Sequence, residues 1–226
     1  MVLDVHTHRE APYPEGIISL DVLSPLFSGG EDGTEPLSVL ADGQLYSAGI
    51  HPWNTERPLT ERDWEILEAL ASDPRVCAIG ECGVDLGHGA PLYQQLLVLK
   101  RQIELAEKMR KPMVFHCVKS ADILMGLKRD FNPRQPWIVH GFRGKPALAA
   151  QLTEKGFYLS FGEKFNPDTV SVTNPERILA ETDESLLPIE EIIARLSEAA
   201  GYELLPRIEE NIRVAAIPAL QPGRAH

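Results

Sequence analysis

The chain has 226 residues, of which 43% are hydrophobic and 24% are charged, a composition typical of globular proteins. Its formal net charge of -11 opposes extensive binding to duplex DNA, which depends on neutralising phosphates with Lys and Arg. It has three cysteines, no basic and apolar leader, and no stretch of roughly 20 apolar residues that could span a membrane. We therefore expect a cytoplasmic protein without a membrane span, with one domain over residues 1–226.

Eight short apolar segments predict strands, and helical patterns separate most of them. The strands are expected at residues 2–6, 17–23, 45–50, 76–80, 112–115, 137–139, 157–161 and 178–180. Helices are expected at residues 61–71, 92–109, 121–128, 145–155, 189–200 and 205–216, the first with Thr60 as its N-cap. This alternation predicts the α/β class and an eight-stranded parallel (β/α)₈ TIM barrel. The barrel should be abbreviated, because the links at residues 9–16 and 24–44 are too short or too broken by Pro and Gly for standard crossover helices.

Several of the expected strands end in residues that can bind metal ions. The carboxyl ends of all strands meet at one mouth of such a barrel, so these side chains should converge. The set consists of His6, His8, Glu81, His116, His140 and Asp183. Each member alone has an ordinary structural explanation, and Asp183 could simply cap the following helix. Six together favour a site for Zn²⁺, Mn²⁺ or Fe²⁺, which imidazole and carboxylate groups bind.

Seven short motifs follow the order found in the TatD-like metal-dependent hydrolases, which the chain resembles over about residues 1–183. The motifs are His6-Thr7-His8, Gly49-Ile50-His51-Pro52, Ile79-Gly80-Glu81-Cys82-Gly83-Val84-Asp85, the Pro112 to His116 segment, His140-Gly141-Phe142, Ser160-Phe161-Gly162 and Glu181-Thr182-Asp183. The resemblance implies a hydrolase barrel with two divalent ions, Zn²⁺, Mg²⁺ or Mn²⁺. Many members are described as deoxyribonucleases, so DNA is the implied substrate class.

The resemblance also implies a division of the ligands between the two ions. One ion would be held by His6, His8 and Asp183, and the other by His116 and His140. Glu81 would bridge the two ions. His51 would line the pocket and help to place the substrate.

Catalysis in such a site should proceed through activated water. Two ions lower the pKa of a bound water and neutralise charge that develops on the attacked phosphoryl or carbonyl centre. Asp183 is expected to orient that water and take its proton, with Glu81 as the second catalytic carboxylate. Lys119 and Arg143 follow the catalytic strands and could contact a phosphate, although solvated surface cations are an equally good explanation.

Three functions agree with this pattern. The first is a phosphodiesterase acting on single-stranded or terminal DNA, where few phosphates must be neutralised. The second is a hydrolase of a small ester, lactone or amide; it is favoured by the acidic charge and by Val118, which stands where the family commonly has a phosphate-binding arginine. The third is a metal-stabilised binding protein without turnover, which would not need an open, carboxylate-bridged pair of ions.

Overall fold

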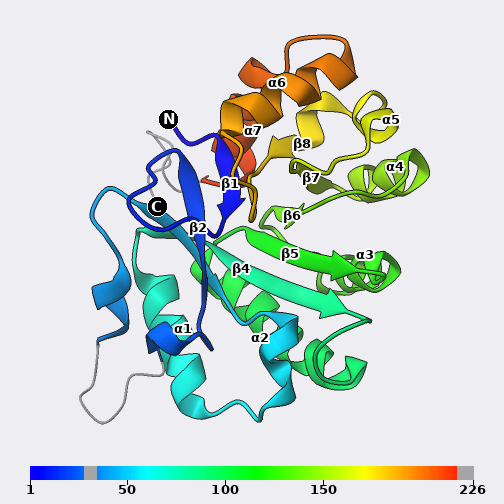
Figure 1. The fold of residues 1–226 in the computed structure, drawn as a ribbon. Helices are drawn as coiled ribbons and strands as arrows, with labels where there is room; N and C mark the ends of the chain where they lie inside the picture. Colours follow the sequence, from blue (N-terminus) through cyan, green and yellow to red (C-terminus); the bar gives the residue numbers. More distant parts are fainter. Residues whose placement is uncertain (28–34, 218–226) are drawn as a thin grey trace.

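Eight parallel strands form a nearly closed barrel, with the helices packed outside it (Figure 1). The computed structural model describes residues 1–27 and 35–217. The strands follow one another in sequence order and are β1 Asp4–Thr7, β2 Gly16–Asp21, β3 Leu45–Gly49, β4 Val76–Asp85, β5 Met113–Val118, β6 Trp137–Val139, β7 Phe157–Phe161 and β8 Ile178–Ala180. Most of their residues are buried, as expected for parallel strands covered on both faces. The predicted barrel is therefore confirmed.

The helices lie close to their predicted positions. They are α1 Glu61–Ser72, α2 Leu92–Met109, α3 Ala121–Phe131, α4 Pro146–Glu154, α5 Pro167–Val170, α6 Ile189–Ala200 and α7 Leu205–Ala215. Thr60 caps α1 as expected, in a reciprocal capping box with Asp63. The one-turn helix α5 was not predicted. Within the described residues, no helix is both long and apolar enough to cross a bilayer.

Where they are described, the first two connections contain no α-helix, which agrees with the predicted abbreviated barrel. No helix separates β1 from β2, and short 3₁₀ turns at Pro25–Phe27 and Pro36–Val39 lie between β2 and β3. Part of the loop predicted at 24–43 lies outside the described residues, because positions 28–34 are not described.

Two strands extend beyond their predicted ends. The strand expected to stop before Glu81 continues as β4 to Asp85, and β5 continues past His116 to Val118. The end of β4 was predicted too early, because Gly80 and Gly83 interrupt the apolar pattern. A Cβ on Gly80 would lie 2.5 Å from the Val114 carbonyl oxygen, and one on Gly83 would lie 2.0 Å from that of His116. Both glycines also have positive φ angles, so they let β4 approach β5 where a side chain would not fit.

The barrel closes between its first and last strands. Thr7 and Asp183 form an isolated parallel bridge, and Figure 1 shows β1 beside β8. The Asp183 N–H donates to the His6 carbonyl at 2.9 Å, and the His8 N–H donates to the Asp183 carbonyl at 3.1 Å. These bonds join the His6 motif directly to Asp183.

A buried carboxyl supports this closure from within. Asp4 is fully buried, and its Oδ1 accepts hydrogen bonds from the backbone N–H groups of His6 at 3.3 Å and Thr182 at 3.0 Å. Its Oδ2 accepts from the Thr182 hydroxyl at 2.6 Å. Burial raises the pKa of Asp4 to about 7, although its hydrogen bonds with Thr182 act in the opposite direction. Asp4 therefore connects the two segments that carry His6 and Asp183.

We expect Asp4→Ala to lower the free energy of unfolding by about 3 kcal/mol, because it leaves several buried donors without an acceptor. Urea denaturation of the metal-free protein measures the change. Asp4→Asn is the matched variant, since it keeps the Oδ1 acceptor and resembles the protonated carboxyl in charge. The free energy of unfolding should fall less than half as much in Asp4→Asn as in Asp4→Ala. Equal losses in the two variants would contradict the proposed hydrogen-bonding role.

Candidate metal centre at the strand ends

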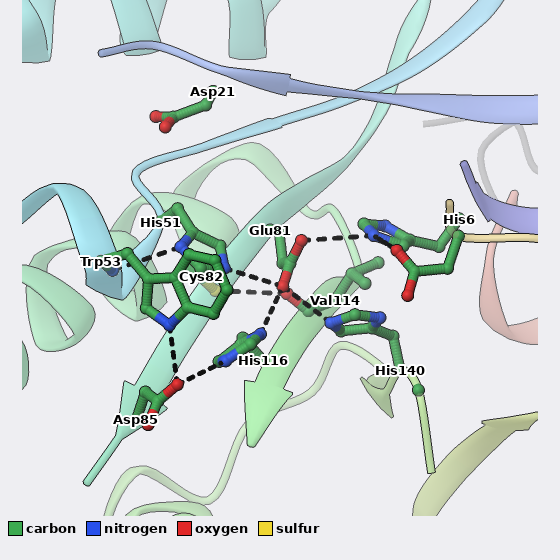
Figure 2. A network of polar contacts seen from close by, with 12 residues as sticks. His6, Asp21, His51, Trp53, Glu81, Cys82, Asp85, Val114, His116 and His140 are labelled. Carbon is green, nitrogen blue, oxygen red and sulfur yellow. Dashed lines mark hydrogen bonds and ion pairs between the residues drawn. The ribbon is translucent and has the colours of Figure 1, made fainter. Parts of the chain in front are cut away.

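Glu81 lies among five histidines contributed by four segments of the barrel, and Figure 2 shows His6, His51, His116 and His140 around it. Its side chain is only 7% exposed. Its Oε1 lies 2.7 Å from His116 Nδ1, 2.7 Å from His140 Nε2 and 3.0 Å from His51 Nε2. Its Oε2 faces a different pair. His6 Nε2 is 3.2 Å away and His8 Nε2 is 3.7 Å away. The two carboxylate oxygens therefore face two separate groups of imidazoles.

Asp183 joins the Oε2 side of this cluster. Its Oδ1 lies 3.9 Å from His6 Nε2 and 3.6 Å from His8 Nε2. All six predicted ligands thus come together, although Glu81 and His116 lie within strands rather than beyond them. Potential ligand atoms lie within 4.8 Å of one another in three sets: His6, His8 and Glu81; His6, His140 and Asp183; and His51, Glu81 and His116.

The donor atoms suit divalent ions, and the buried polar groups support this fit. The His6 ring is fully buried, and its Nδ1 has no hydrogen-bond partner among the described residues, while its Nε2 faces the carboxylates of Glu81 and Asp183. Such groups are normally hydrogen-bonded, and an orphaned one calls for an explanation such as an ion. An imidazole nitrogen beside two carboxylates is a suitable ligand for Zn²⁺ or Mn²⁺.

In each histidine, the contact made by the ring nitrogen that faces away from Glu81 determines whether the other nitrogen can bind an ion or donates a hydrogen bond. His51 Nδ1 accepts from the Trp53 backbone N–H at 3.2 Å, so a neutral His51 carries its proton on Nε2 and donates toward Glu81. His116 has the opposite arrangement. Its Nε2 lies 3.1 Å from Asp85 Oδ2, so the carboxylate favours a proton there and leaves the Nδ1 lone pair facing Glu81. His116 could therefore hold an ion with this ring orientation, whereas His51 is set up as a hydrogen-bond donor.

A second buried carboxylate lies behind His140. Glu181 is fully buried, and its Oε1 lies 3.5 Å from His140 Nδ1 while accepting a hydrogen bond from the Gly141 N–H. A proton on His140 Nδ1 leaves Nε2 free to face Glu81. Glu181 and Asp85 thus support His140 and His116 in the same way.

The sequence motifs contained these supporting residues, but their roles were not predicted. Asp85 follows Glu81 by four positions, so both side chains lie on one face of a continuous strand. That signal was missed because the strand was expected to end at Glu81. Asp21 and Trp53, which line the same cavity, were also missed.

The cluster opens into a cavity of about 960 Å³ at the barrel mouth. Lys119 and Arg143 line this cavity, as does His51. Both cations are exposed, and neither has an ion-pair partner within residues 1–27 and 35–217. Arg143 also borders a smaller polar cavity of about 180 Å³ beside Asp183. The structure therefore places all three predicted substrate-binding residues at the mouth.

In the absence of metal, Glu81 and His140 strongly perturb each other. Burial opposes ionisation of Glu81, but the charge of His140 and hydrogen bonds from the surrounding histidines hold its pKa well below the usual range. Burial opposes protonation of His140, but Glu81 and Glu181 together raise its pKa well above the usual range. The metal-free site thus favours an ion pair between Glu81 and His140.

This ion pair predicts a pH dependence of stability for the metal-free protein. The contribution of Glu81 is present above its ordinary pKa of 4.5 and is lost as the pH falls through its lowered value. The contribution of His140 is complete below its ordinary pKa of 6.5 and is lost as the pH rises through its raised value. We expect the difference in unfolding free energy between wild type and Glu81→Gln to be largest at about pH 5.5 and to shrink as the pH rises through the raised pKa of His140. Urea titrations with a chelator present test this, and equal differences would contradict the ion pair.

Comparisons with known proteins agree with the fold and with the site. A family model for TatD-related DNases matches residues 37–197, well over half of the chain. The chain is 31% identical over 185 residues to the metal-dependent hydrolase YjjV of Escherichia coli K12, covering 76% of this chain and 67% of that protein. It is 33% identical over 132 residues to the 3'-5' ssDNA/RNA exonuclease TatD of Erwinia billingiae, covering 53% of this chain and 48% of that protein. These matches span about half to two thirds of the curated relatives.

Solved structures extend the likeness of the fold to nearly the whole chain. The crystal structure of YjjV, a TatD homologue from Escherichia coli K12, superimposes with a TM-score of 0.74 at 19% identity, covering 94% of this chain and 96% of that one. A TatD family hydrolase from Entamoeba histolytica superimposes with a TM-score of 0.73 at 16% identity, covering 95% and 97% of the two chains. Taken with the family match, these comparisons show that the chain belongs to the TatD family of metal-dependent hydrolases.

Proposed function

We propose that this protein is a metal-dependent phosphodiesterase that hydrolyses single-stranded or terminal DNA. The observation that carries the proposal is the position of Glu81, whose two oxygens face two groups of histidines. The names of relatives such as the Erwinia billingiae exonuclease support a nucleic-acid substrate. The net charge of -11 favours single strands and ends over long duplexes, because fewer phosphates need to be neutralised.

In the arrangement implied by the family resemblance, the proposed site would hold two divalent ions, Zn²⁺, Mg²⁺ or Mn²⁺. His6, His8 and Asp183 would hold one and His116 and His140 the other, with Glu81 available to both. When bound, such ions would act as Lewis acids that lower the pKa of a bound water and neutralise negative charge on a phosphate.

The chain's own residues provide orientation and proton transfer. Asp183 can accept a proton from a water held at Oδ1, the oxygen that faces His6 and His8. His51 Nε2–H, fixed by its bond from the Trp53 backbone, can donate to Glu81 or to a substrate oxygen that enters beside it. Lys119 and Arg143 can pair with flanking phosphates at the mouth. Glu81, Asp183 and His51 thereby act on one substrate position.

A substrate panel at constant metal concentration tests the proposal. The wild-type protein is supplied in turn with Mg²⁺, Mn²⁺ and Zn²⁺ and is given labelled single-stranded DNA, the same sequence as a blunt duplex, and a set of small esters, lactones and amides. We expect cleavage of the single strand, with slower cleavage of the duplex. Turnover of the small substrates with intact DNA would overturn the nuclease assignment and favour a small-molecule hydrolase. Metal binding without turnover of any substrate would indicate a binding protein.

A further inference from the structure

An exposed tryptophan forms part of the cavity wall beside the ligand cluster. Trp53 follows His51 by two residues, in the 3₁₀ turn η3 Pro52–Glu56, and half of its surface is accessible to solvent. The other two tryptophans, Trp64 and Trp137, are buried. The Trp53 ring lines the same cavity of about 960 Å³ as the ligand cluster.

The ring of Trp53 is held in one orientation. Its indole Nε1–H donates to Asp85 Oδ2 at 2.7 Å, and Asp85 is itself buried (Figure 2). The ring packs edge to face against His51 and His116, with centroid separations of 5.0 and 5.6 Å and interplanar angles of 86° and 76°. The polar edge of the indole is therefore already occupied, and the His88 ring also lies against it at a centroid separation of 5.2 Å. What remains for a ligand is the solvent-exposed half of the aromatic surface. Since the ring is already ordered, binding to it costs little side-chain entropy.

A single histidine side chain separates the Trp53 ring from Glu81, where the substrate is proposed to react. Both imidazoles that contact Trp53 also contact Glu81, through His51 Nε2 at 3.0 Å and His116 Nδ1 at 2.7 Å. A flat group that rests on Trp53 is thus adjacent to a phosphate that sits at Glu81. In a nucleic acid, the flat group attached next to a phosphate is a nucleobase, and bases stack on aromatic side chains whatever their sequence.

We propose that Trp53 is the stacking platform for the terminal base of the nucleic-acid substrate, a specificity residue that requires a base at the attacked end. The inference rests on the proposed nuclease function and deepens it. Trp53 contributes affinity, while Glu81 and Asp183 carry the reaction. The site should therefore prefer a strand with an intact terminal base over one that ends in an abasic sugar, with little preference among the four bases.

Binding is measured first, with full-length protein, Mg²⁺ and thymidine pentamers whose phosphorothioate linkages resist cleavage. Tryptophan fluorescence reports on Trp53, because Trp64 and Trp137 are buried. We expect an oligomer with an intact end to quench the emission and to bind about 10- to 100-fold more tightly than one with an abasic residue at the attacked end. Cleavage rates for the same two ends, with ordinary phosphodiesters, provide the second readout.

Two substitutions separate stacking from a structural role. Trp53→Leu removes the ring, whereas Trp53→Phe keeps a ring and removes the donor to Asp85. If Trp53 stacks on the base, Trp53→Leu loses the preference for the intact end, so that its affinities for the two ends converge, while Trp53→Phe retains most of the preference. Tyr93→Leu, which removes an exposed aromatic ring on α2, serves as the control and should match wild type.

Each alternative outcome overturns a specific claim. If Trp53→Leu and Trp53→Phe both lose the same cleavage rate on intact and on abasic ends, then Trp53 acts through Asp85 by positioning His116. A wild-type protein that cleaves DNA but does not distinguish the two ends would refute the stacking platform and leave the nuclease proposal standing. A wild-type protein that neither binds nor cleaves DNA would refute both proposals.

Discussion

Glu81→Gln is expected to lower kcat/KM by at least about 10³-fold, which corresponds to about 4 kcal/mol of transition-state stabilisation. The reason is geometric. The amide replaces one acceptor oxygen with an NH₂ donor and removes the charge that faces both imidazole groups. The variant should also retain less than the two divalent ions per chain proposed for the wild type.

Steady-state kinetics on labelled single-stranded DNA and metal analysis after dialysis measure the two effects of Glu81→Gln. Glu104→Gln, at an exposed position on α2, makes the same chemical change away from the mouth and serves as the control. Circular dichroism verifies that both variants fold. Wild-type metal content and activity in Glu81→Gln would show that the histidine cluster works without its central carboxylate.

Asp183→Asn is expected to reduce kcat by about 10³-fold and to leave KM within a few-fold of wild type, because it removes the proposed proton acceptor but not the substrate-binding groups. The fold should tolerate it well. The bonds that close the barrel use the Asp183 backbone, and Asn accepts the positive φ of 54° at this position as readily as Asp does.

Exposed Asp168 on α5 provides the control for Asp183→Asn, as Asp168→Asn. Measuring kcat and KM separately is essential, because a rise in KM alone would assign Asp183 to substrate binding. Loss of activity only in proportion to lost metal would make Asp183 a ligand and not the proton acceptor.

The sequence was most informative at the strand ends, where the candidate metal ligands lie. The apolar runs that end near His6, His116, His140 and Asp183 predicted both the barrel and the residues gathered at its mouth. These positions could be found because parallel strands all deliver their carboxyl ends to one edge. The likeness to TatD-like hydrolases then added the division between two ions, which the residues alone did not indicate.

The remaining features depend on three-dimensional packing that has no local signal. Gly80 and Gly83 break the apolar pattern, so nothing in the sequence indicated that β4 continues to Asp85. The pairing of Asp4 with Thr182 joins residues 178 positions apart. The exposure of Trp53 follows from the path of the turn after β3, which the sequence does not specify. These three features could be recognised only in the three-dimensional structure.

The bridge between Thr7 and Asp183 also sets when the candidate metal centre can form. The two residues are separated by 176 positions in the sequence, so contacts that are among the most distant within the described residues complete that centre. During synthesis, the His6 motif leaves the ribosome before Asp183 and meets it only after most of the barrel has been made. Contacts this far apart form late, because closing a long loop is entropically costly. A nascent chain, or one truncated before Asp183, therefore carries its histidines without a complete candidate metal centre.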